Sequence, residues 1–203
     1  MSGGLARRRI GYIVEGHGEV DAVRVLLRRW LSHIGRTHEY QVLEPVRTGV
    51  DKLKNPLDDQ RQQGIEYAVR AAVRQRPDVL LVMLDADKEC VLPARPPLGP
   101  TLLRRARSVA AHVDIAVVVA DPEYEAWFLR HAPSVFPDTT EPQPVKRDCK
   151  GVVTGLLGQK YLEAVHQAQL TKALPLPAPD DIAAIADRSY RKLFKELARL
   201  IPP

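Results

Sequence analysis

Apolar runs alternate with amphipathic stretches through the first two thirds of the chain. Residues 78–84 and 115–120 are almost continuously apolar, and residues 9–14 are rich in β-branched and aromatic side chains. Continuous apolar runs are typical of strands covered on both faces, as in parallel sheets. Residues 41–47 form a weaker candidate, and Pro45 within it favours a strand at the sheet edge. The pattern predicts a mainly parallel sheet of about four strands.

Between these runs, apolar residues recur at helical spacing. One stripe extends from Val20 to Ile34, a second from Ile65 to Val73 and a third from Leu102 to Ala110. Each stripe gathers its apolar side chains on one side of a helix. Strands that alternate with helices of this length predict a right-handed α/β sheet flanked by helices.

The last third of the chain changes character. Prolines cluster at 133–144 and again at 175–179, and the segments after each cluster carry helical patterns. In the final helix the apolar stripe consists of Tyr190, Leu193, Phe194, Leu197, Leu200 and Ile201. We expect residues 1–142 to form the α/β core and residues 143–203 to form a helical extension packed on it, because the extension is too short to bury much surface of its own.

Composition adds constraints on compartment and partners. The 203 residues are 45% hydrophobic and 27% charged, which is ordinary for a folded chain, and the net charge of +5 permits a phosphate-bearing partner without establishing one. Cys90 and Cys149 are too few for a disulfide framework or a four-thiolate zinc site, so we expect a cytoplasmic protein. No apolar run reaches the roughly 18 residues of a membrane-spanning helix, so no membrane partner is expected.

Carboxylates follow each of the three clearest strands. In an open α/β sheet, ligands bind just beyond the carboxyl ends of the strands, so these residues are expected to converge. The acidic residues concerned are Glu15, Glu19, Asp85, Asp87, Asp121, Glu123 and Glu125. Converging carboxylates repel one another unless a cation offsets their charge, and hard oxygen ligands suit Mg²⁺ or Mn²⁺. The spacing therefore predicts a Mg²⁺ or Mn²⁺ site at this edge of the sheet.

Each acidic group has an ordinary explanation as well. Asp85-Ala-Asp87 can begin a solvated loop, and Glu15 before a glycine fits a simple turn. Glu123 and Glu125 suit the first turn of a helix, where the helix dipole favours acids. The coincidence of all three groups at strand ends, in chain order, favours the metal site over these explanations.

The turn Gly16-His17-Gly18 excludes one alternative. No Gly-Lys-Ser/Thr follows it, so the chain has no phosphate-binding loop of the P-loop type. His17 lies in the acidic loop and is a candidate for contacting substrate. We expect Trp127 and Phe128, which follow the last acidic pair at helical positions, to be core residues.

Three motifs at the strand ends, together with a C-terminal pattern, resemble those of a known family. They are Val14-Glu15-Gly16-His17-Gly18-Glu19, Leu84-Asp85-Ala86-Asp87, Pro122-Glu123-Tyr124-Glu125-Ala126-Trp127-Phe128, Asp148-Cys149-Lys150-Gly151, Tyr161, and Arg188-Ser189-Tyr190-Arg191-Lys192-Leu193. With them the chain resembles a Toprim-like family of bacterial proteins, often encoded beside an ABC-type ATPase and related to the Toprim domain of the overcoming-lysogenisation-defect nucleases.

The resemblance implies a Toprim-like (Rossmann-like) α/β fold and phosphodiester chemistry with a divalent metal. Glu15, Asp85 and Asp87 would be the catalytic residues, with Glu15 as the acid–base residue or a metal ligand. Glu19 would be a further ligand, and Glu123 or Glu125 would complete a second site. Lys88-Glu89 departs from a longer acidic motif, so the number of metals, one or two, stays open.

Two absences favour the nuclease branch of the Toprim proteins. No tyrosine is assignable as a topoisomerase nucleophile, and the chain has no primase-type zinc module. The leading hypothesis is a Mg²⁺- or Mn²⁺-dependent nuclease acting with an ATPase partner in phage or mobile-element defence. The alternatives are a non-catalytic subunit that docks on an ABC-type ATPase, and a small nucleotide phosphohydrolase.

Basic residues around the acidic edge are candidates for holding nucleic-acid phosphates. They are Arg47, Lys52, Lys54, Lys146, Arg147, Lys150, Arg191 and Lys192. A solvated surface is the alternative for each of them. DNA, RNA and tRNA all stay open as substrates, as does the oligomeric state.

Overall fold

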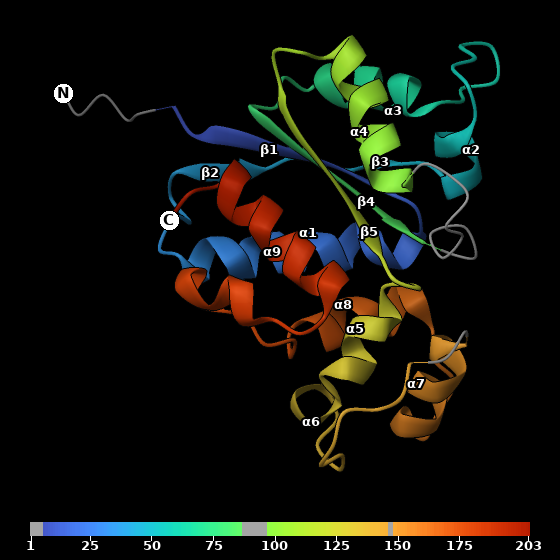
Figure 1. Cartoon of the computed structure of the whole chain (residues 1–203), viewed down its shortest axis with the longest axis vertical. Helices are drawn as coiled ribbons and strands as arrows, with labels where there is room; N and C mark the ends of the chain where they lie inside the picture. The colour runs from blue at the N-terminus through green and yellow to red at the C-terminus, as the bar shows by residue number, and fades with distance from the viewer. Residues whose placement is uncertain (1–5, 87–96, 146–147) are drawn as a thin grey trace.

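The computed structural model describes residues 6–86, 97–145 and 148–203, and places five parallel strands of this part of the chain in one sheet (Figure 1). The strands are β1 (Arg8–Val14), β2 (Tyr40–Val42), β3 (Val46–Arg47), β4 (Val79–Asp85) and β5 (Asp114–Ala120). The order is β2-β1-β4-β5, and β3 pairs with β1 further along the same strand. The prediction of a mainly parallel α/β sheet is confirmed.

The weakest predicted strand, residues 41–47, is two short strands rather than one. The Leu43 N–H donates to the Ile10 carbonyl, after which the chain passes Pro45, and pairing with β1 resumes at Val46 opposite Ile13. Proline has no N–H to donate to a neighbouring strand, so the pairing with β1 is interrupted at Pro45. The sheet therefore has five strands where about four were expected.

Two layers of helices cover the sheet. Helices α1 (His17–His33) and α9 (Arg188–Leu200) lie on one face, and α3 (Ile65–Val73) and α4 (Leu98–Val109) lie on the other (Figure 1). Successive residues of β4 alternate between the two buried clusters: Leu81 and Met83 face α1 and α9, while Leu80 and Val82 face α3 and α4. Burial on both faces is the reason the strands read as continuous apolar runs.

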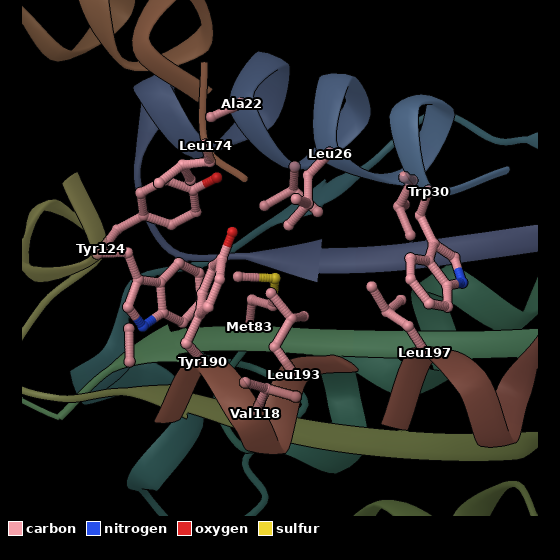
Figure 2. Packing of buried hydrophobic residues seen from close by; sticks show 14 of the residues in the cluster. Ala22, Leu26, Trp30, Met83, Val118, Tyr124, Leu174, Tyr190, Leu193 and Leu197 are labelled. Carbon is pink, nitrogen blue, oxygen red and sulfur yellow. The ribbon is translucent and has the colours of Figure 1, made fainter. Parts of the chain in front are cut away.

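The C-terminal helix contributes directly to the core of the sheet. All six residues of its predicted stripe are buried, in the same cluster as residues of β1, β4 and β5. Figure 2 shows Leu193 and Leu197 of α9 opposite Leu26 and Trp30 of α1, with Met83 of β4 among them.

Shorter elements complete the described chain. They are α2 (Val50–Lys54), α5 (Glu125–Arg130), α6 (Ala132–Val135), α7 (Cys149–Leu157), the π-helix η1 (Glu163–Gln167), α8 (Ala168–Thr171) and the 3₁₀-helix η2 (Pro179–Ala184). The longer predicted helices correspond to α1, α3, α4 and α9, whereas α2 and α6 were not predicted. Across the described ranges, we find no helix with the length and apolar character needed to cross a membrane.

The strand order fixes where a ligand should bind. From β1, the chain first forms β2 and β3 on one side and later β4 on the other side. The crevice beyond the carboxyl ends of β1 and β4 is therefore the point where the order reverses, which is where open α/β sheets bind their ligands.

Candidate metal centre and adjoining cleft

Three strand ends bring acidic residues together at this crevice. Glu15 follows β1, Asp85 ends β4, and Glu123 and Glu125 follow β5. A carboxylate oxygen of Glu15 accepts a long hydrogen bond of 3.4 Å from the Asp85 N–H, and Asp85 Oδ1 accepts one of 2.9 Å from the Tyr124 N–H. Glu15, Glu19, Asp85, Glu123 and Glu125, called here the acidic centre, are all residues that the sequence predicts to converge.

Three of these side chains are close enough to share one cation. Asp85, Glu123 and Glu125 each offer an oxygen, and these oxygens lie within 4.8 Å of one another. Oxygens on opposite sides of a Mg²⁺ ion are about 4.2 Å apart, because each Mg–O bond is about 2.1 Å. Neighbouring oxygens on the same octahedral ion are about 3.0 Å apart, so the three side chains would have to close in by up to about 2 Å to share one ion.

Glu125 is the most deeply buried member of the centre. The residue is only 1% exposed to solvent. Its Oε1 accepts hydrogen bonds from the Tyr161 hydroxyl at 2.7 Å and from Gln167 Nε2 at 3.4 Å. Its other oxygen, Oε2, is buried with no hydrogen-bond partner among the described residues. A buried carboxylate oxygen in that position needs a proton or a cation.

Burial and mutual repulsion raise the pKa values of the centre. Burial, followed by the charges of Glu19, Glu125, Glu15 and Glu123, raises the pKa of Asp85 well above its ordinary value. Burial raises the pKa of Glu125 to about 7, against the lowering effect of the Tyr161 hydrogen bond. The centre without a cation therefore retains protons near neutral pH, which a divalent ion would displace.

Glu19 also stabilises the start of α1. Its Oε2 accepts the N–H groups of Glu15 at 2.9 Å and Gly16 at 2.8 Å, at the N-terminus of the helix, where backbone N–H groups have no intrahelical acceptor. Burial, opposed by the Gly16 hydrogen bond and aided by the charge of Glu15, raises its pKa to about 6. The residue thus fixes the backbone that carries Glu15 into the centre.

A lysine from the C-terminal extension reaches the centre. Lys150 Nζ lies 2.6 Å from Glu163 Oε1 and 3.8 Å from Glu123 Oε2. Burial disfavours its charged form, but the hydrogen bond to Glu163 and the charges of Glu125, Glu163 and Glu123 outweigh it and raise the pKa of Lys150. Sequence reasoning proposed Lys150 as a phosphate ligand and overlooked Glu163.

The π-helix η1 turns two of its residues toward the centre. Glu163 pairs with Lys150, and Gln167, four residues later, donates to Glu125. Single π-helical turns occur frequently at functional sites. Gly18 allows η1 to pack against the start of α1, because a Cβ there would stand 2.3 Å from Gln167 Oε1 and 2.8 Å from the Glu163 carbonyl carbon. The Gly16-His17-Gly18 motif, which by itself predicts only a turn, is the signal in the sequence for this close approach.

A cleft of about 520 Å³ adjoins the acidic centre and is called here the β3–α3 cleft. Glu15 lines it and so connects it to the centre. Its other lining residues are Val46, Arg47, Thr48, Gly49, Val50, Asp51, Lys52, Gln62, Tyr67 and Ala68. Arg47 and Lys52 are exposed, and neither side chain forms an ion pair with a residue in the described ranges.

The remaining predicted residues lie in several places. Arg191 donates to the Ile185 carbonyl and Lys192 pairs with Glu196, both within the C-terminal segment. His17 is exposed in the first turn of α1. Trp127 and Phe128 are fully buried, as predicted. Six residues named in the sequence analysis lie outside the described ranges: Asp87, Lys88, Glu89, Cys90, Lys146 and Arg147.

Comparisons with protein-family models, with curated proteins and with solved structures returned no match to this chain.

Proposed function

We propose that the chain is a Toprim-like nuclease that cleaves phosphodiester bonds with Mg²⁺ or Mn²⁺. The observation that carries the proposal is the convergence of Asp85, Glu123 and Glu125 within 4.8 Å, with Glu125 Oε2 buried and unpartnered in the described chain. All the donors are carboxylate oxygens, the ligand type that these two ions prefer.

Asp85, Glu123 and Glu125 would hold the ion, and Glu15 lies beside them. A bound Mg²⁺ or Mn²⁺ would supply Lewis-acid stabilisation of negative charge on the phosphodiester oxygens. Glu15 lines the cleft and also contacts the Asp85 backbone, so it stands between bound substrate and the other acids. From this position its carboxylate can take the proton of an attacking water.

Three cations flank this acidic centre. Arg47 and Lys52 lie in the cleft on the β3 side, and Lys150 approaches from α7. Exposed arginine and lysine side chains without acidic partners are suited to phosphate oxygens, which supply most of the affinity for nucleic acid. The acids, together with the exposed Arg47 and Lys52, which form no ion pair with a described residue, support a polyanionic substrate.

The Toprim-like assignment and an ABC-type ATPase partner in phage or mobile-element defence belong to the same proposal. The strand-end motifs support them, and a parallel sheet whose carboxyl edge gathers those motifs is the architecture they require.

The direct test is cleavage of plasmid, single-stranded DNA and RNA with Mg²⁺ or Mn²⁺. Wild type and the control Asp180→Ala, which changes an exposed acid on η2, should cleave, whereas Asp85→Ala and Glu15→Ala should lose at least 100-fold in rate, as expected for loss of a metal ligand or base. Equal weak activity in all four proteins would identify a contaminating nuclease and overturn the proposal.

Calorimetry separates the alternatives. Titration with Mg²⁺ or Mn²⁺ should give a binding signal in wild type that is lost in Asp85→Ala. Absence of any signal, alone or with nucleic acid, would favour a non-catalytic subunit that docks on an ATPase. Hydrolysis of free nucleotides without cleavage of polymers would favour a small nucleotide phosphohydrolase.

A further inference from the structure

The β3–α3 cleft has the size of a small-ligand site. Its volume of about 520 Å³ lies within the roughly 300–1,000 Å³ of typical ligand pockets. Such a space accepts one nucleotide unit. In a duplex each base is stacked and paired, so a base could enter only after leaving its stack.

Aromatic and cationic side chains come from different walls of the cleft. Tyr67 is half-buried on α3, while Arg47 ends β3 and Lys52 lies on α2. Proteins that bind single strands use this combination, with bases stacking on aromatic rings and cations following the phosphates. One nucleotide can meet both groups at once if its base lies on Tyr67 and its phosphate on Arg47 and Lys52.

Gln62 adds a polar group at the same cleft. Its backbone has a φ of +54°, an uncommon conformation for a residue other than glycine, within a turn closed by hydrogen bonds between Asp58 and Gln63. Its side-chain amide can both donate and accept, which suits the edge of a base. The turn therefore holds a group capable of base contact beside the aromatic wall.

The acidic residues of the cleft do not oppose this use. Asp51 contributes one negative charge against the two positive charges of Arg47 and Lys52, all three being exposed, and Glu15 belongs to the acidic centre, where a bound cation would offset it. Arg47 and Lys52 then determine the local charge, and they favour a phosphate.

We propose that the β3–α3 cleft binds one unstacked nucleotide of a single-stranded nucleic acid, with its base against Tyr67 and its phosphate on Arg47 and Lys52. The inference rests on the proposed function and names the substrate class of that site. It implies that single strands and frayed ends are bound and duplex interiors are not.

The test uses oligonucleotides with 2-aminopurine at successive positions, whose fluorescence is quenched when the base stacks on an aromatic ring. Binding is measured with wild-type protein and Ca²⁺, and gels establish that the oligonucleotides stay intact. We expect quenching confined to one or two positions. Tyr67→Ala should abolish it and weaken binding about 5- to 150-fold, since base–aromatic stacking is worth about 1–3 kcal/mol per base. Tyr67→Phe should retain both.

The phosphate contact has its own measurement. Arg47→Ala should lower the slope of log K against log salt by about 0.7, the contribution of one single-strand phosphate contact. Arg28→Ala, which changes an exposed arginine on α1, should leave the slope unchanged. Unchanged quenching in Tyr67→Ala, equal affinity for duplex, or full competition by a mononucleotide at the same concentration would each overturn the proposal.

The two proposals fail in different ways. If quenching depends on Tyr67 but no metal supports cleavage, the nucleotide-binding role of the cleft is supported and the nuclease proposal is overturned. If wild type cleaves, and Tyr67→Ala cleaves single strands and duplex at the same rate as wild type, the nuclease proposal is supported and the nucleotide-binding role of the cleft is overturned.

Discussion

The hydroxyl of Tyr161 donates a 2.7 Å hydrogen bond to Oε1 of the buried Glu125. Burial and the Glu125 charge raise the pKa of Tyr161, so the hydroxyl keeps its proton and acts as a donor. The contact links the segment between α7 and η1 to the first residue of α5. Through it, the C-terminal extension orients a residue of the acidic centre.

Tyr161→Phe removes this donor without removing the ring. Because the hydrogen bond favours the charged carboxylate, its loss should raise the pKa of Glu125 above about 7 and weaken Mn²⁺ binding at pH 7. The free energy of unfolding should fall by about 1–3 kcal/mol. Calorimetric titration of Mn²⁺ at several pH values measures the first effect, and chemical denaturation measures the second.

Tyr40→Phe is the matched control for Tyr161→Phe. It also removes a tyrosine hydroxyl with one protein partner, Arg8, but it lies on β2. Mn²⁺ affinity should be unchanged in this variant. A pH profile for Mn²⁺ binding that is identical in wild type and Tyr161→Phe would show that Tyr161 does not orient Glu125.

The raised pKa values make the metal-free protein less stable at higher pH. A carboxyl with a raised folded pKa stabilises the fold below its ordinary value of 4.5, and this contribution is lost as pH rises through the folded value. The stabilisation is therefore lost between about pH 4.5 and 6 for Glu19, and between about pH 4.5 and 7 for Glu125. Glu125 alone should account for about 3 kcal/mol across its range.

Calorimetric melting in EDTA between pH 5 and 8 measures this loss of stability in the metal-free protein. Burial lowers the pKa of His131, which acts in the opposite sense over part of this range, so the comparison is with Glu125→Gln. Wild type should lose several degrees in Tm relative to that variant as pH rises, and Mn²⁺ should restore more at pH 8 than at pH 5. Parallel melting profiles for the two proteins would rule out a pKa shift at Glu125.

Much of this fold could be predicted because the signal is local. The runs at 78–84 and 115–120 are apolar on both faces of one sheet, and the stripe of α9 is buried at every predicted position. Helices α2 and α6, with five and four residues, are too short for a periodicity to emerge. Pro45 indicates that the strand is interrupted, but nothing in the sequence indicates that the chain pairs with β1 again after it.

The site was predictable only in part for the same reason. Asp85 ends a strand, and Glu15, Glu123 and Glu125 each follow one, and the rule for open α/β sheets gathers strand ends. Glu163 lies on a π-helix distant in sequence, and its place beside Lys150 depends on how the extension packs on the end of the sheet. No local pattern encodes that packing, except the requirement for glycine at position 18.

Gly18→Ala tests that packing. The added Cβ would clash with the Gln167 side chain and, more seriously, with the Glu163 backbone, which cannot rotate away. We expect a loss of about 1–3 kcal/mol, typical of overpacking, together with weaker Mn²⁺ binding as Gln167 leaves Glu125. Denaturation and calorimetry measure the two effects.

Gly155→Ala supplies the comparison for Gly18→Ala. A Cβ at Gly155 on α7 would meet no atom within 4 Å, so this change should be neutral or stabilise the helix by up to about 1 kcal/mol. If Gly18→Ala were as stable as Gly155→Ala and bound Mn²⁺ normally, the close approach of α1 and η1 would not matter to the centre.

Lys150→Met separates a phosphate ligand from a counter-charge. Lys150 lies among Glu123, Glu125 and Glu163, where its ammonium competes with a divalent ion for the same acids. Removing it should tighten Mn²⁺ binding about three- to tenfold, because the repulsion between two cations near a protein surface is lost. If Lys150 also contacts the substrate phosphate, cleavage should slow by about tenfold or more, as for loss of a charge-assisted hydrogen bond.

Lys195→Met, an exposed position on α9, should change neither quantity. Calorimetry gives the Mn²⁺ affinity and single-turnover cleavage gives the rate, so the two effects can be read in the same three proteins. Tighter Mn²⁺ binding with an unchanged cleavage rate would assign Lys150 to charge balance alone. Weaker Mn²⁺ binding would mean that Lys150 mainly holds Glu123 and Glu163 in place. Removal of a lysine that mainly competes with Mn²⁺ would strengthen Mn²⁺ binding instead.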